Sequence, residues 1–181
     1  ICSVLSELNY IDGENIAPEG EMLSSIYSEF DLLVSESIRQ KIWNELTPAE
    51  LASVLSAIIF QARNDDEAKM KTPKGTILEA TKSMERIWFA IHTLESKNRL
   101  DTMRQIDTGL TWATYRWASG ATLSEVLENT DLTAGDFVRQ MKQLLDLLTQ
   151  ISALSNPLSF AASEATKLLK RGVIAYSNQV A

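Results

Sequence analysis

The fold is decided by one stretch, Thr47-Pro48-Ala49-Glu50-Leu51-Ala52-Ser53-Val54-Leu55-Ser56-Ala57-Ile58-Ile59-Phe60. Thr47 is a favourable N-cap residue, Pro48 suits the first helical position, and Glu50 can complete a capping box. The helix predicted from Leu51 to about Ala62 is apolar on nearly every side, and such a helix lies inside a protein. We therefore expect it at the centre of the hydrophobic core.

Around this central helix the sequence predicts further helices and one β-hairpin. A turn signal between two short apolar patches indicates the hairpin over residues 9–17, and helical spacing extends from Met22 to Ile42. Residues 64–75 are expected to form an exposed loop. Further helices are predicted from about Thr76 to Lys97, from about Thr102 to Trp117, from Thr122, for roughly twenty residues from Thr133, and from Asn156-Pro157 nearly to the C-terminus. The expected fold is mainly α, a single helical bundle with a small N-terminal β-hairpin.

Length and composition fit one domain over residues 1–181. The chain is 45% hydrophobic and 23% charged, which is ordinary for a globular protein of a size that needs no metal or disulfide. It has no apolar run near the ~20 residues that span a membrane, so no membrane partner is expected. The single cysteine, Cys2, indicates a reducing compartment, which we predict to be cytoplasmic. The apolar helical pattern begins at Ile1 itself, so we expect a piece excised from a larger protein.

Charge is distributed unevenly along the chain. The net charge is −7, but residues 1–60 hold ten acidic residues against Arg39 and Lys41. The remaining residues carry fourteen acidic and fifteen basic side chains. A polyanion such as nucleic acid would therefore be bound by the later part of the chain.

Sequence motifs for catalysis are absent from the chain. It contains neither a phosphate-binding loop of the form GxxxxGK[ST] nor a dinucleotide fingerprint. Its one histidine, His92, and its one cysteine are too few for a zinc site, and their pairing as a nucleophile is the less favoured alternative. Asp65-Asp66-Glu67 could bind a cation but is more simply a solvated loop. We predict no catalytic residue, no metal site and no cofactor in this chain.

A one-sided polar pattern marks the helix over residues 136–151. Phe137, Met141, Leu144, Leu148 and Ile151 share one face, and Gln140 is expected at its periphery. In the last helix, Lys167, Lys170 and Arg171 form a short basic stripe. These polar faces either meet water or line a nucleic-acid channel, and the pattern leaves both interpretations open. The candidate nucleic-acid-binding residues are Arg139, Lys142, Gln143, Asp146, Gln150, Lys167, Lys170 and Arg171.

Five motifs in a fixed order resemble one known family. They are Val4-Leu5-Ser6-Glu7-Leu8-Asn9-Tyr10-Ile11, the stretch from Glu45 to Ala57, Trp117-Ala118-Ser119-Gly120-Ala121, Gly135-Asp136-Phe137-Val138-Arg139, and Lys170-Arg171-Gly172-Val173-Ile174. Together they resemble the DSHCT domain, the C-terminal domain of superkiller-type and HelY-type DExH-box RNA helicases. The resemblance extends over essentially the whole chain.

The resemblance implies a helical bundle that packs against two RecA-like motor domains of the same polypeptide. Those domains, absent from this chain, would bind ATP and Mg. The resemblance also implies that the helix beginning at Gly135-Asp136 acts as a ratchet on single-stranded RNA leaving the motor. Arg139 stands at the family's arginine, Lys142 at a usually basic position and Asp146 at an acidic one.

Four positions depart from the family pattern. Ala134 replaces the usual glutamate, Gln143 a common basic residue, Leu145 a common acidic residue, and Gly172 the usual aspartate. These differences suggest a weaker or less polar grip on the strand than in a typical member.

Two functional hypotheses follow. The first is an accessory domain of an ATP-dependent RNA helicase that contacts the strand through Arg139 and Lys142 and braces the motor. The second is an interaction or structural bundle whose acidic N-terminal third docks a partner protein. As an alternative to strand contact by Lys142, Asp146 could hold that lysine in an i,i+4 pair, and the lysine would then serve the helix and not the strand.

Overall fold

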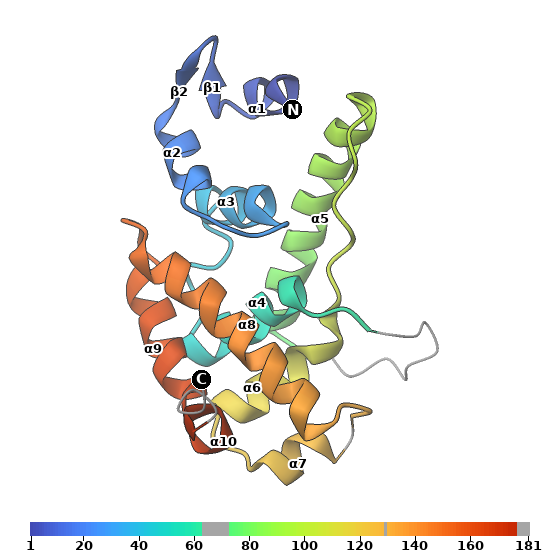
Figure 1. Ribbon diagram of the computed structural model, residues 1–181, viewed down its shortest axis with the longest axis vertical. Helices are drawn as coiled ribbons and strands as arrows, with labels where there is room; N and C mark the ends of the chain where they lie inside the picture. The colour runs from blue at the N-terminus through green and yellow to red at the C-terminus, as the bar shows by residue number, and fades with distance from the viewer. Residues whose placement is uncertain (63–72, 129, 177–181) are drawn as a thin grey trace.

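The computed structural model describes residues 1–62, 73–128 and 130–176, which are mainly helical (Figure 1). One antiparallel hairpin pairs β1 (Ile11–Asp12) with β2 (Asn15–Ile16), with Ile11 opposite Ile16. The mainly α fold with a small N-terminal hairpin is confirmed. Asp65, Asp66 and Glu67, and most of the predicted loop 64–75, lie outside the described residues. The helices are α1 (Cys2–Glu7), α2 (Pro18–Ser24), α3 (Asp31–Arg39), α4 (Pro48–Ile59), α5 (Thr76–Lys97), the 3-10 helix η1 (Thr108–Leu110), α6 (Thr111–Ala118), α7 (Leu123–Leu127), α8 (Ala134–Ala153), α9 (Ser159–Leu169) and α10 (Gly172–Tyr176).

Helix α4 is the central helix that the sequence predicts. The Glu50 carboxylate accepts a hydrogen bond from the Thr47 backbone N–H at 2.8 Å, and the Thr47 hydroxyl accepts from the Glu50 N–H, which completes the capping box. Every residue from Leu51 to Ile58 is buried. α4 contacts α5, α6, α8 and α9, and Figure 1 shows it in the middle of these helices. Its place in the core is confirmed, although the helix ends at Ile59 rather than near Ala62.

Two buried serines allow other helices to pack closely against α4. The Ser53 hydroxyl donates to the Thr111 carbonyl at 2.7 Å, and the Ser56 hydroxyl donates to the Ser53 carbonyl at 2.6 Å. Both hydroxyls are therefore satisfied inside the core, as buried polar groups must be. Ala52 and Ala57 are also buried, so α4, which packs against α6 and α9, carries several small side chains among its buried residues.

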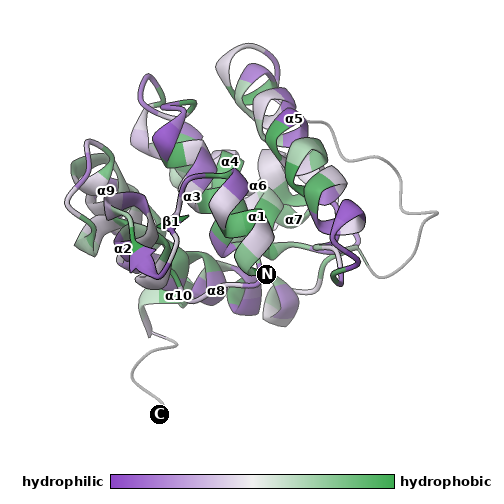
Figure 2. Cartoon of the chain, turned by 90° about the horizontal axis from the view of Figure 1, so that it is seen from above, coloured by the Kyte–Doolittle hydropathy of each residue, from purple (hydrophilic) through white to green (hydrophobic). Residues whose placement is uncertain are grey.

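Helix α8 has the two faces that the sequence predicts. Thr133 caps it by accepting a hydrogen bond from the Asp136 N–H at 3.1 Å. Its apolar residues are buried against α4, α9 and α10, and hydrophobic and hydrophilic positions alternate along it in Figure 2. The buried residues are Phe137, Met141, Leu144, Leu145, Leu147, Leu148 and Ile151. This face holds α8 in place and leaves the polar face outside.

Arginine side chains close the C-terminal ends of four helices. Carbonyls in the last turn of a helix have no partner within the helix, and the helix dipole favours a cation there. Three of the guanidinium groups also lie over aromatic rings, at 5.4 Å from Tyr10, 4.6 Å from Phe30 and 3.7 Å from Trp117. The donations are Arg39 to Leu8 after α1, Arg104 to Ile58 and Phe60 at the end of α4, Arg116 to Glu125 in α7, and Arg171 to Trp117 and Ala121 around the end of α6.

The helix predicted from about Thr102 begins later than expected. Residues 101–107 are not helical, and the helical segment starts with η1 and continues as α6. Asp107 accepts hydrogen bonds from Ala62 N–H at 2.8 Å and Gly109 N–H at 2.9 Å, so it is the N-cap. Trp88 Nε1 also donates to the Arg104 carbonyl at 2.8 Å. Hydrogen bonds to distant residues hold this segment extended, and they outweigh its helical spacing.

The last helix is shorter than predicted. α9 ends at Leu169, and Gly172, the first residue of the next helix, has φ +49°, a left-handed conformation through which a right-handed helix cannot continue. A separate short helix, α10, follows. The break turns Arg171 toward α6, so Lys167, Lys170 and Arg171 do not form one helical stripe. Helical spacing over 22–42 is interrupted too, because residues 25–30 link α2 to α3 without helix.

We expect Leu55→Ala or Ile58→Ala to lower the free energy of unfolding by about 2–5 kcal/mol, because either change leaves a cavity in the core. Leu55 is 0% exposed and Leu168 on α9 is 38% exposed. Leu168→Ala deletes the same atoms as Leu55→Ala and should cost at most about 1 kcal/mol. Urea denaturation measures these values. Similar costs for Leu55→Ala and Leu168→Ala would contradict the central position of α4.

We also expect Arg171→Lys to destabilise the domain by about 1–3 kcal/mol, since an ammonium cannot bond both carbonyls while stacking on Trp117. The neighbouring variant Lys170→Ala changes an exposed side chain and should stay within about 0.5 kcal/mol of the parent. Thermal unfolding of both proteins compares the two changes. A stable Arg171→Lys protein would show that this guanidinium is dispensable for the fold.

Candidate nucleic-acid interface

The structure brings five of the predicted site residues onto the outer face of α8. Arg139, Gln143 and Asp146 are exposed, while Lys142 and Gln150 are half-buried. Lys142 and Gln143 are adjacent in sequence and share one turn, and the other steps along the face are three or four residues, or about one helical turn. Because the opposite side of α8 is buried in the core, this face is presented by a fixed element.

An ion pair with Asp136, in the first turn of α8, holds Arg139 in place. Its Nη2 donates to Asp136 Oδ1 at 2.8 Å, with 58% of the arginine side chain exposed. Asp136 in turn accepts a hydrogen bond from the Thr133 hydroxyl at 2.9 Å. A guanidinium has five N–H donors, so this pair orients the group and leaves other donors toward solvent. The arrangement suits a phosphate or a base edge.

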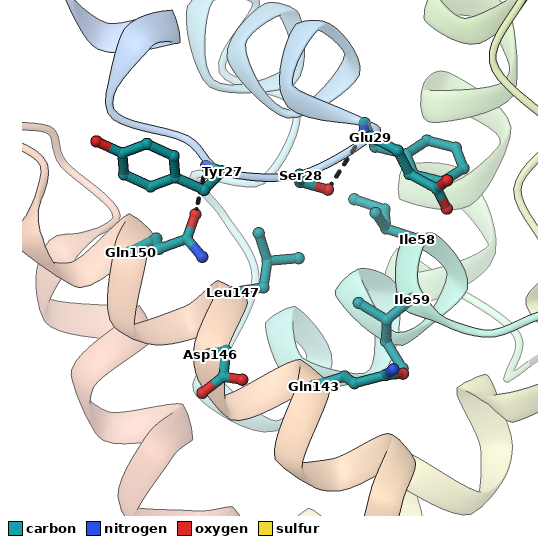
Figure 3. Close-up of a pocket in the computed structure, with 10 residues that line it drawn as sticks. Tyr27, Ser28, Glu29, Ile58, Ile59, Gln143, Asp146, Leu147 and Gln150 are labelled. Carbon is teal, nitrogen blue, oxygen red and sulfur yellow. Dashed lines mark hydrogen bonds between the residues drawn. The ribbon is translucent and has the colours of Figure 1, made fainter.

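A pocket of about 260 Å³ lies between α8 and the segment that links α2 to α3 (Figure 3). Gln150 connects the two elements, because its Oε1 accepts a hydrogen bond from the Tyr27 backbone N–H at 2.7 Å. The end of α4 supplies the third wall. The lining residues are Tyr27, Ser28, Glu29, Phe30, Ile58, Ile59, Gln143, Asp146, Leu147 and Gln150.

Sequence reasoning finds only the α8 side of this pocket. Gln143, Asp146 and Gln150 stand out by helical periodicity, whereas Tyr27 lies in a segment whose apolar spacing suggests helix. Tyr27 is 82% exposed, between the buried residues Ile26 and Phe30. An aromatic residue that departs from the apolar periodicity of its neighbours was the one available signal.

A smaller cavity, of about 40 Å³, lies beside Arg139 at the other end of the face. The residues after α4, Phe60, Gln61 and Ala62, form one wall, and Gln140 contributes to the other. Gln140 is half-buried, and its Oε1 lies inside without a hydrogen-bond partner among the described residues. Gln140 therefore lies at the boundary between the buried and the exposed faces of α8, with its amide oxygen on the buried side.

The other three predicted site residues do not extend the α8 face. Lys167 pairs with Glu164 on its own helix at 2.6 Å. Lys170 is exposed at the C-cap of α9. Arg171 closes the end of α6 and stacks on Trp117, so its donors serve the fold.

Several acids of the N-terminal third also serve the fold. Glu36 pairs with Arg39 at 2.9 Å and accepts a hydrogen bond from the buried Tyr10 hydroxyl at 2.7 Å. Burial is the main reason that the pKa of Tyr10 is raised, so this hydroxyl stays a donor. Glu7 pairs with Lys97 at 3.2 Å and Glu29 with Arg104 at 3.3 Å. Several acidic residues of this region therefore pair with groups of the same chain and are not directed at a partner.

The described ranges offer no metal centre. Within residues 1–62, 73–128 and 130–176, no group of His, Cys, Asp and Glu side chains is placed to hold a metal ion. His92 stacks on Trp88 with ring centroids 4.8 Å apart, and Cys2 is exposed on α1. None of the described helices combines the length and apolar character needed to cross a bilayer.

Comparison with known proteins identifies the family. The DSHCT (NUC185) domain matches residues 13–177. "Probable helicase HelY" of Mycobacterium leprae is 36% identical over 97% of this chain, which covers 21% of that protein. "ATP-dependent RNA helicase mtr4" of Schizosaccharomyces pombe is 28% identical, and "Exosome RNA helicase MTR4" of Homo sapiens 26%, each over 82% of the chain and 14% of the relative. The chain thus spans about a fifth of these relatives or less. As the five ordered motifs predicted, it belongs to the DSHCT domain family.

Proposed function

We propose that this domain is the C-terminal accessory part of an ATP-dependent DExH-box RNA helicase and contacts the single strand that leaves the motor. The observation that carries the proposal is the outer face of α8, where Arg139, Lys142, Gln143, Asp146 and Gln150 follow one another beside an open pocket. The relatives named as RNA helicases support RNA as the ligand. Cationic and amide side chains on one face can bind phosphates and base edges together.

The proposal assigns energy conversion to other parts of the polypeptide. ATP and Mg would be bound by RecA-like motor domains, and this bundle would brace those domains in the cytoplasm. A helix buried on every side, as α4 is, supports a rigid bracing role. The short share of each relative that the chain covers is consistent with further domains.

A second candidate is the docking of a partner protein through the N-terminal third. One observation favours it: a hollow of about 420 Å³ between α1 and the end of α5 is lined by Asp31 of that third and by Asp101, which follows α5. Burial raises the pKa of Asp31, so a cationic neighbour would stabilise its charged carboxylate. Partner capture that depends on Asp31 and Asp101, and not on Arg139, would favour this candidate.

We expect the purified 181-residue chain to hydrolyse no ATP, with or without RNA, because it lacks a phosphate-binding loop. Phosphate release is measured at several protein concentrations after repurification. Hydrolysis that scales with the chain and survives repurification would contradict the assignment of ATP to other domains.

We expect Arg139→Ala and Lys142→Ala to weaken single-stranded RNA binding by the full-length product of the gene, without unfolding the bundle. Removal of one phosphate interaction should reduce the slope of log affinity against log salt by about 0.7. Fluorescence anisotropy at several salt concentrations measures both quantities, and thermal unfolding checks the fold.

The control variant carries Lys82→Ala and Arg86→Ala. Both residues are exposed on α5, so the control removes the same two charges from another helix. It should retain the parent's salt slope. If the α8 double variant binds RNA with unchanged affinity and slope, the polar face of α8 is solvated surface and the role of the domain reduces to bracing.

A further inference from the structure

The pocket between α8 and residues 27–30 has an apolar floor and a polar rim. Phe30, Ile58 and Leu147 are at most 4% exposed and form the floor. Gln143, Asp146 and Gln150 line the α8 side of the pocket, and Figure 3 shows Leu147 between Gln150 and Ile58 and the Gln143 side chain beside Ile59. A nucleobase has the same character, with flat apolar faces and a hydrogen-bonding edge. Proteins bind unstacked bases of single strands through these two features.

Tyr27 supplies an aromatic surface at the mouth of this pocket. Its backbone N–H is fixed by Gln150 at 2.7 Å, whereas its side chain is 82% exposed. Figure 3 shows the ring extending outward from the mouth above Gln150. The ring therefore contributes little to the core, while the backbone that carries it is anchored to α8 by this hydrogen bond. Such a ring can stack on a base of any sequence.

The charges around the pocket favour a base over a phosphate inside it. Asp146 and Glu29 both line the walls, and Glu29 is paired with Arg104. A phosphate entering between carboxylates would be repelled, while exocyclic amino groups of adenine and cytosine are donors that a carboxylate accepts. Arg139 lies toward the N-terminal end of the same face, and its guanidinium can bind a phosphate there. The two ends of the face thus suit different parts of a nucleotide chain.

We propose that this pocket, defined by Tyr27, Gln143, Asp146, Leu147 and Ile58, receives one base of the single strand while Tyr27 stacks on the next base. The inference rests on the proposed function, because it requires a strand along α8. It adds Tyr27, from a segment over a hundred positions away in sequence, to the residues that touch the strand. It also assigns Asp146 a preference for bases that carry an exocyclic amino group.

The test compares labelled oligoadenylate, oligouridylate and an abasic strand of equal length, bound to the full-length gene product. Tyr27→Ala should weaken oligoadenylate binding by about five- to hundredfold, the range expected when one stacking interaction is removed. Binding of the abasic strand should not change, since it offers no base to stack. Tyr27→Phe keeps the ring and should bind as the parent does. Tyr176→Ala is the matched control, because Tyr176 on α10 is 70% exposed and outside the pocket.

Asp146→Asn tests the edge interaction independently of stacking. The parent should bind oligoadenylate more tightly than oligouridylate, and the substitution should narrow that ratio, because an amide offers a donor as well as an acceptor. An unchanged ratio would overturn the role of Asp146. Thermal unfolding of each variant separates loss of binding from loss of fold.

The outcomes distinguish this inference from the function on which it rests. If the Arg139 and Lys142 variants lose RNA affinity while Tyr27→Ala binds oligoadenylate as the parent does, the pocket is not a base site and the helicase role stands. If Tyr27→Ala weakens the abasic strand equally, the ring acts on the fold or the backbone, and the proposed stacking is wrong. If none of these variants alters RNA binding, both proposals fail.

Discussion

The closing of helix ends by arginine is the interaction on which the rest of the structure depends. Helices α1, α4, α6 and α7 each end where a guanidinium from another segment bonds their last carbonyls. Short helices are marginal alone because their terminal groups lack partners. Each arginine thus joins two segments while it completes a helix, and three of them add an aromatic face. Arg139 belongs to a different class, since the residue that orients it lies on its own helix.

The sequence predicts the parts of the fold that rest on local periodicity. α4 and α8 follow directly from their apolar patterns and from the caps at Thr47 and Thr133. The extended segment before η1, the break before Gly172 and the link at residues 25–30 were not predictable, because hydrogen bonds to distant residues determine them. The candidate site divides in the same way. Its α8 wall is a periodic pattern, whereas the Tyr27 wall exists only through tertiary contact.

The positions that depart from the family pattern have different roles in the structure. Leu145 is 5% exposed, so the change from an acidic residue there concerns packing. Gly172 has φ +49°, a conformation that glycine and aspartate tolerate better than other residues. The aspartate that the resemblance implies at this position can therefore meet the same backbone requirement as glycine. Gln143 is different because it lines the pocket, and it is the departure that bears on ligand binding.

Helix α8 also has the properties of a ruler. It is unbroken over 20 residues, and an α-helix advances about 5.4 Å per turn. From Arg139 to Gln150 a polar side chain recurs at each turn, so the polar groups on this face are spaced at nearly constant intervals. Because the opposite side of the helix is buried, these polar groups keep fixed positions relative to one another. A flexible polymer lying along such a scale experiences a periodic energy profile, and it can move by one mark while it exchanges one set of partners for the next.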